Sequence, residues 1–155
     1  MKITVVTPTF NEAENLPKLV SALFSLPLDL RILVVDDNSP DGTGAVADEL
    51  ARQHPAESIS VLHRAGKLGL RTAYLEGFAS ALETDTDIIV QMDADFSHDP
   101  SALVAMSARL ASCDVVLGSR YVSGGSVDER WPLWRKGLSA FGNFYARAIL
   151  GLPLR

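Results

Sequence analysis

The stretch RILVVDDN, residues 31–38, decides the fold of this sequence. Its centre, 32–35, is continuously apolar, which is typical of a strand that helices cover on both faces. Other short apolar runs predict strands at 3–7, 59–63, 87–92 and 114–118. Helical patterns lie at 12–26, 42–54, 70–83, 100–111 and 133–150. This alternation predicts parallel βαβ units in an open α/β sheet with helices on both faces.

Composition narrows the class of protein. The chain has 155 residues and 47% hydrophobic content, which suits one α/β domain with a core of its own. Its formal net charge of -5 provides no general basic surface, so we expect no nucleic-acid partner. No apolar run reaches the roughly 18 residues of a spanning helix, so any membrane contact is expected to be peripheral.

Polar clusters follow three of the predicted strands: PTFNE at 8–12, DDNS at 36–39 and DAD at 93–95. Ligands of open parallel sheets bind outside the carboxyl ends of the strands, so we expect these clusters to converge on one site. Asp93 and Asp95 are alternate residues and project to the same side of an extended segment. Two such carboxylates suit Mg²⁺ or Mn²⁺. Asp85 and Asp87 repeat the spacing before their strand, and we interpret them as a solvated turn.

The acidic residues after the first two strands each have two interpretations. Asp36 and Asp37 either contact a ribose or base, or form an Asx turn in their loop. Glu12 either caps its own helix or reaches a ligand. Asn11 with Glu14 predicts a capping box for the first helix.

Three further features have local interpretations. Asp99 before Pro100 predicts a helix N-cap. The segment GKLGLR, 66–71, opens a helix and is either an anion-binding start or an ordinary turn. Four cationic residues and two tryptophans follow the last predicted strand: Arg120, Arg130, Trp131, Trp134, Arg135 and Lys136. The cations suit phosphate groups, and the tryptophans suit either a membrane surface or packing in a core.

Four motifs occur in the order of a known family: PTFNE (8–12), VVDDNSPDGT (34–43), MDADFSH (92–98) and GSRY (118–121). Together they resemble family 2 glycosyltransferases, specifically the dolichol-phosphate or polyprenol-phosphate mannosyltransferases. The resemblance implies a GT-A fold over 1–155, without the C-terminal part that family members have. It further implies a GDP-mannose donor, a polyprenyl phosphate acceptor and a protein peripheral to the cytoplasmic face of a membrane.

The resemblance also implies roles for single residues. The nucleotide sugar would be bound by Pro8, Phe10, Glu12, Val35, Asp37, Asp93, Ala94, Asp95 and Ser97. The metal ion, Mg²⁺ or Mn²⁺, would be held by Asp93, Asp95 and Ser97, and the catalytic residues would be Asp95, Arg120 and Arg135. The chain departs from the family's usual pattern at Phe10, where tyrosine is common, and at Asn38 and Arg71, where glycine is common.

Other functions fit part of the pattern. A UDP-sugar transferase of the same superfamily would share the motifs, and so would a non-catalytic remnant that binds nucleotide without transferring sugar. The stretch 31–38 also resembles the first strand of a response-regulator receiver. Here, however, it forms the second predicted strand, and no Lys-Pro pair follows the fifth, which argues against a receiver.

Overall fold

The structure is a computed structural model that describes residues 1–119, 122 and 132–151. The chain divides into two compact units, Met1–Ala108 and Arg109–Arg155, and each is described by itself.

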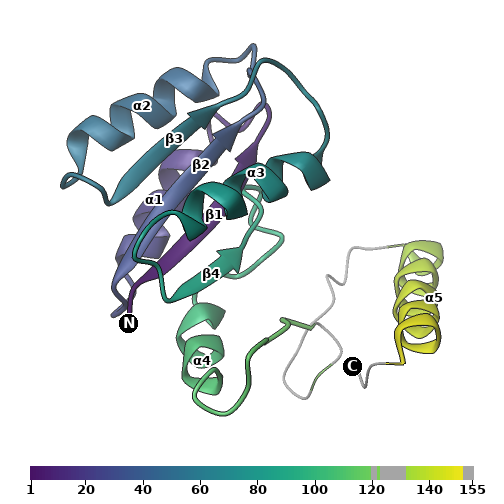
Figure 1. Ribbon diagram of the computed structural model, residues 1–155. Helices are drawn as coiled ribbons and strands as arrows, with labels where there is room; N and C mark the ends of the chain where they lie inside the picture. The colour runs from purple at the N-terminus through teal and green to yellow at the C-terminus, as the bar shows by residue number, and fades with distance from the viewer. Residues whose placement is uncertain (120–121, 123–131, 152–155) are drawn as a thin grey trace. The chain divides into compact units, whose positions relative to one another are not determined.

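The first unit is built on a parallel sheet of four strands in the order β3-β2-β1-β4 (Figure 1). The strands are β1 (Ile3–Thr9), β2 (Leu30–Asp36), β3 (Ile59–His63) and β4 (Ile88–Gln91). Val5 of the central strand β1 pairs with Ile32 on one side and with Val90 on the other. The prediction of a parallel sheet is confirmed, and the apolar stretch 32–35 lies in β2, covered on both faces.

Helices cover the two faces of this sheet. On one face, α1 (Leu16–Phe24) and α2 (Thr43–Gln53) pack against the side chains of Val5 and Ile32. On the other, α3 (Leu70–Leu82) packs against Val6 and Val35. A short helix, α4 (Ala102–Arg109), contributes Leu103 to the first of these cores. All four helices were predicted, to within a few residues at their ends.

Gly77 lets α3 lie unusually close to the sheet. A Cβ atom at this position would lie 2.4 Å from Cγ1 of Val6 and 3.0 Å from Cγ2 of Val35. Both contacts are below normal carbon–carbon separation, and valine side chains have little rotamer freedom to move aside. The close approach places the start of α3 beside the carboxyl ends of β1 and β2.

Two local predictions are wrong. Residues 114–118 form neither strand nor helix, and Val115 and Leu117 are exposed. An apolar run becomes a strand only where a neighbouring strand supplies its hydrogen bonds, and no partner pairs with this segment in the described part of the chain.

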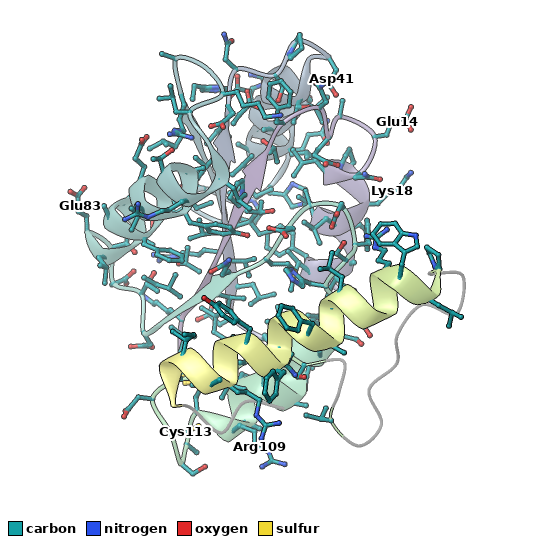
Figure 2. The ribbon with its side chains drawn as sticks, turned by 90° about the vertical axis from the view of Figure 1, so that its right-hand side faces the viewer. Glu14, Lys18, Asp41, Glu83, Arg109 and Cys113 are labelled. Carbon is teal, nitrogen blue, oxygen red and sulfur yellow. The ribbon has the colours of Figure 1, made fainter. Side chains whose placement is uncertain are left out.

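The predicted capping box of Asn11 and Glu14 is also wrong. Asn11 adopts a positive φ of 62° and its backbone N–H donates to Ser39 in the next loop. The helix begins only at Leu16, and Glu14 points away from the molecule (Figure 2). At Asp99, the other predicted cap, the carboxylate accepts the backbone N–H of Ser101 at 2.9 Å in the turn that precedes α4, and the helix itself begins at Ala102.

In the second unit, α5 (Leu133–Leu150) has the predicted range and ends at Gly151, whose φ is 62°. Apolar side chains recur on it every three or four residues and are exposed: Trp134, Leu138, Phe141, Tyr145 and Ile149. None of the helices in the described ranges combines the length and apolar character of a bilayer-spanning segment.

Candidate functional site

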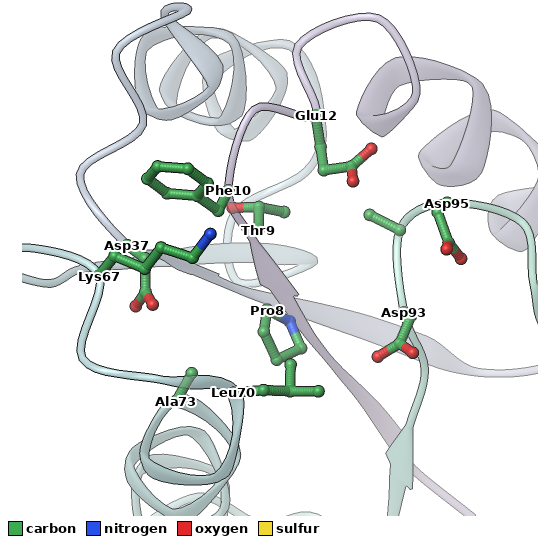
Figure 3. A pocket seen from close by; sticks show the side chains of 11 residues that line it. Pro8, Thr9, Phe10, Glu12, Asp37, Lys67, Leu70, Ala73, Asp93 and Asp95 are labelled. Atoms are coloured by element: carbon green, nitrogen blue, oxygen red, sulfur yellow. The ribbon is translucent and has the colours of Figure 1, made fainter.

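A pocket of about 230 Å³ opens at the carboxyl edge of the sheet in the first unit. It lies where the chain order reverses between β1 and β4, the usual ligand position in open parallel sheets. All three strand-end clusters contribute to it, together with the start of α3 (Figure 3). The lining residues are Pro8, Thr9, Phe10, Glu12, Asp37, Lys67, Leu70, Ala73, Asp93, Ala94 and Asp95.

One wall of the pocket combines an aromatic ring with a cation. The ammonium group of Lys67 lies 3.9 Å from the centre of the Phe10 ring. This is cation–π geometry, and it orders two loops that are far apart in sequence. Of the two basic residues in 66–71, Lys67 lines the pocket. Arg71 is exposed and does not line it.

The adjacent acids Asp36 and Asp37 have different tasks. The carboxylate of Asp36 is buried and accepts hydrogen bonds from the hydroxyls of Thr9 at 3.1 Å and Ser39 at 2.6 Å. It also accepts the backbone N–H of Ser39, three residues on. The Asx turn that one interpretation predicted for this loop forms at Asp41, whose carboxylate accepts the backbone N–H of Thr43 at 3.0 Å. Asp37 instead lines the pocket. Of the two acids, therefore, only Asp37 is placed to meet a ligand.

Arg64 holds Asp37 in place and was not identified from the sequence. Its side chain is buried and its guanidinium donates to Asp37, to Thr72 at 2.6 Å, and to both carboxylate oxygens of Glu76 at 3.1 Å. Burial alone would lower the pKa of Arg64, but the hydrogen bonds and charges of Glu76 and Asp37 outweigh it and raise that pKa. Arg64 therefore stays charged and fixes Asp37 at the pocket wall. Its position directly after β3 was the available signal, because residues there meet those following β2.

The opposite wall carries the acids that follow β4. Both carboxylate oxygens of Asp95 accept hydrogen bonds from Ser97, at 2.8 Å from its backbone N–H and 2.9 Å from its hydroxyl. Partial burial would raise the pKa of Asp95, but these hydrogen bonds outweigh it and lower that pKa. Asp93 accepts a 2.5 Å hydrogen bond from the hydroxyl of Tyr74, and its backbone N–H donates to His98. Both carboxylates are thus oriented by neighbours.

The donor set of this wall fits a hard divalent cation. Among the residues that the structure describes, no three His, Cys, Asp or Glu side chains are grouped to hold a metal ion. The pocket instead offers the pair Asp93 and Asp95. Mg²⁺ in particular is often bound by one or two carboxylates and completes its shell with water and substrate phosphate oxygens. The second D-x-D sequence lies elsewhere: Asp85 is half-exposed and pairs with Lys2 and Arg31, as expected of a surface turn.

Two described residues of the first unit that were singled out from the sequence do not line the pocket, and two others lie outside that unit or outside the described residues. Val35 is fully buried in the core beneath α3. Ser97 does not line the pocket, but it donates two hydrogen bonds to Asp95, which does. Arg135 lies on α5 in the second unit, and Arg120 lies outside the described residues.

Two relatives of established name are similar to the chain over nearly its whole length. It is 48% identical over 151 residues to the polyprenol monophosphomannose synthase of Mycolicibacterium smegmatis, covering 97% of this chain and 56% of the relative. It is 44% identical over 154 residues to the undecaprenyl-phosphate mannosyltransferase of Micrococcus luteus, covering 99% of this chain and 62% of the relative. The chain therefore spans somewhat more than half the length of these two proteins.

The fold is shared with solved glycosyltransferase structures. A mannosyltransferase of Pyrobaculum calidifontis, solved with GDP-Man and Mn²⁺, superposes with a TM-score of 0.60 at 23% identity, over 74% of this chain and 33% of that one. The mannosyl-3-phosphoglycerate synthase of Rubrobacter xylanophilus gives a TM-score of 0.56 at 22% identity, over 72% of this chain and 36% of that one. These likenesses establish the GT-A type of fold that the sequence predicted. The model of glycosyl transferase family 2 matches residues 4–153, and the chain belongs to this family.

Proposed function

We propose that this chain forms the donor-binding part of an inverting mannosyltransferase that moves mannose from GDP-mannose to a polyprenyl phosphate. The observation that carries the proposal is the pocket itself, which combines an aromatic wall, a fixed acid and an acidic pair on one sheet edge. One relative is named a polyprenol monophosphomannose synthase and the other an undecaprenyl-phosphate mannosyltransferase. These names support a polyprenyl phosphate as the acceptor.

The nucleoside would occupy the wall formed by Phe10, Glu12 and Asp37. The Phe10 ring offers an apolar face on which a base can stack, as the tyrosine common in the family also would. Asp37 is held by Arg64 and offers a carboxylate to the N–H or O–H donors of a guanine or ribose. Lys67 lines the same pocket and would attract the negatively charged diphosphate.

The diphosphate would lie toward Asp93 and Asp95. These carboxylates would hold Mg²⁺ or Mn²⁺, with Ser97 orienting Asp95. When bound, such a cation offsets the negative charge that develops on the departing diphosphate. The Pyrobaculum mannosyltransferase was solved in complex with GDP-Man and Mn²⁺, which supports the choice of ligands.

The chemical step needs no strong general base. The acceptor is a phosphate monoester whose second pKa is about 6, so it is already largely anionic at neutral pH. Its oxygen attacks the anomeric carbon of mannose from the face opposite the diphosphate leaving group. A new C–O bond forms as the bond from that carbon to the diphosphate oxygen breaks, with inversion, and GDP departs. In the proposal, Arg120 and Arg135 bind acceptor or donor phosphate through paired hydrogen bonds. Catalysis then rests on positioning and on charge stabilisation.

The acceptor is a lipid, and α5 has the character of a helix that lies on a membrane. Its exposed apolar side chains include Trp134, Phe141 and Tyr145. Its only charged residues are Arg135, Lys136 and Arg147, all cationic. A basic helix with an aromatic face binds the interface of anionic bilayers. We therefore propose peripheral contact with a membrane through α5.

A single titration series tests the donor. GDP, UDP, GDP-mannose and UDP-glucose are each titrated into the protein by calorimetry, with and without Mn²⁺. We expect GDP-mannose and GDP to bind at least tenfold more tightly than the uridine ligands, and Mn²⁺ to strengthen both. Tighter UDP-glucose binding would favour the UDP-sugar alternative. Tight GDP binding without any transfer to polyprenyl phosphate would favour the non-catalytic alternative.

Flotation on lipid vesicles tests the membrane contact. The protein should float with vesicles that contain anionic phospholipid, and less with neutral ones, because the charged residues in the sequence of α5 are all cationic. Replacing Trp134 and Phe141 by serine should reduce flotation. Equal recovery with and without vesicles would refute the contact.

A further inference from the structure

Tyr74 links the core of the first unit to the acidic wall of the pocket. It lies in the second turn of α3, and its side chain is buried. The ring packs in the cluster with Val6 and Val35, and its centre lies 5.7 Å from that of Phe78. From this packed position, the hydroxyl reaches the end of β4 and donates to Oδ1 of Asp93 at 2.5 Å.

The geometry constrains Asp93 more tightly than chain connectivity alone would. Tyrosine has only two side-chain torsions, and packing of the ring in the core fixes both. The backbone N–H of Asp93 is held separately, at 3.2 Å from Nδ1 of His98. Asp93 is thus held at its backbone and at one carboxylate oxygen, and its side chain lines the pocket (Figure 3).

The Tyr74 hydroxyl is the donor in this contact, because a carboxylate can only accept. A phenol is a neutral hydrogen-bond donor at neutral pH. A neutral donor at this position takes up one acceptor site of Asp93 without competing with a cation for its charge.

We propose that Tyr74 is a positioning residue that orients Asp93 for binding of a divalent cation with the donor diphosphate. The proposal rests on the proposed function, because it takes Asp93 as a metal ligand. Hydrogen-bond partners of metal ligands commonly set the orientation and basicity of those ligands, and their removal costs about 10- to 100-fold in metal affinity. A phenylalanine would fill the same core volume, so packing alone gives no reason for the hydroxyl.

The test is Tyr74→Phe, with Mn²⁺ binding as the readout. Mn²⁺ is titrated into the protein saturated with GDP, and free Mn²⁺ is followed by electron paramagnetic resonance. We expect the Mn²⁺ dissociation constant to rise about 10- to 100-fold, while GDP affinity in the absence of metal stays within twofold of the wild type. Circular dichroism checks that the variant keeps the wild-type fold.

The matched control is Phe78→Leu, which disturbs the packing beside the Tyr74 ring and leaves the hydroxyl in place. It should lower the thermal midpoint but change Mn²⁺ affinity less than twofold. If Tyr74→Phe binds Mn²⁺ as the wild type does, or if Phe78→Leu weakens binding equally, the inference is overturned. If the wild type does not bind Mn²⁺ in the presence of GDP, or if Asp93→Ala binds Mn²⁺ as the wild type does, the metal assignment in the proposed function fails. The inference about Tyr74 then fails with it.

Discussion

Replacing Arg64 by methionine should destabilise the first unit more than any surface substitution. The Arg64 side chain is 2% exposed, and its partner Asp37 is 8% exposed. Removing the guanidinium leaves Asp37 as an unpaired carboxylate at a nearly closed position, which costs about 3–5 kcal/mol. Glu76 adds little to this cost, because it is 48% exposed and water can replace its partner.

This loss is a large part of the roughly 5–15 kcal/mol by which a domain is stable. With a urea dependence of about 2 kcal/mol per molar, the midpoint of unfolding should fall by about 2 M. The assay is urea denaturation followed by far-ultraviolet circular dichroism. The control is Arg52→Met, which removes an exposed ion pair with Glu49 on α2 and should leave the midpoint unchanged.

A double variant separates the buried charge from general loss of packing. If the penalty comes from the unpaired carboxylate, Arg64→Met combined with Asp37→Leu should be more stable than Arg64→Met alone, because both polar partners are removed together. A penalty from the unpaired carboxylate is refuted if the single variant unfolds at the wild-type midpoint. It is also refuted if the second substitution adds a further loss of similar size.

Four other substitutions test the remaining assignments. Asp95→Ala should abolish transfer and Mn²⁺-dependent GDP binding but spare metal-free GDP binding, and normal turnover with metal would contradict its role. Ser97→Ala removes the hydroxyl hydrogen bond that helps lower the pKa of Asp95, so in a pH titration Mn²⁺ binding should fail at a higher pH than in the wild type; an unchanged acid limit would contradict this. Arg135→Ala should raise the KM for polyprenyl phosphate about tenfold with the KM for GDP-mannose unchanged, and unaltered acceptor kinetics would count against it. Gly77→Ala should lower the thermal midpoint, because overpacking against Val6 costs about 1–3 kcal/mol and exceeds the gain of up to about 1 kcal/mol in helix propensity; a higher midpoint would show that α3 shifts freely.

The strands and helices were predictable because their signals are local. The apolar run 32–35 needed only burial on both faces to become β2, and the chain supplies that through α1, α2 and α3. The acids of the pocket were predictable from one topological rule, since residues at the carboxyl ends of parallel strands share an edge. Residues 114–118 show the limit of such signals. Their apolar pattern can be read locally, but a strand also needs a partner from elsewhere in the chain, which the local pattern does not reveal.

The residues that orient these acids could not be predicted in the same way. Arg64 contacts Asp37 across 27 positions in sequence, and Tyr74 contacts Asp93 across 19. In the sequence, Arg64 looks like a solvated loop cation and Tyr74 like a core aromatic. Their roles depend on how closely α3 approaches the sheet, which is set by packing at Gly77 rather than by any periodic pattern.

The residues of the motif in the loop after β2 have two different roles. Within DDNSPDGT, 36–43, Asp37 is the residue that lines the pocket. The hydroxyl of Ser39 donates to Asp36 and accepts the backbone N–H of Asn11 at 3.1 Å. Further along, Thr43 accepts the backbone N–H of Glu12 at 2.9 Å. These bonds satisfy backbone donors of the loop after β1 that no strand or helix pairs.

The consequence is that the loop after β2 fixes the loop after β1. Phe10 and Glu12, the two residues proposed to meet the nucleoside, are neighbours of the backbone groups that this network holds. Substituting Ser39 or Thr43 should therefore weaken nucleotide binding even though neither lines the pocket. Most of the motif residues described above hold the loops of the site in place. Fewer residues of the motif are placed to contact a ligand.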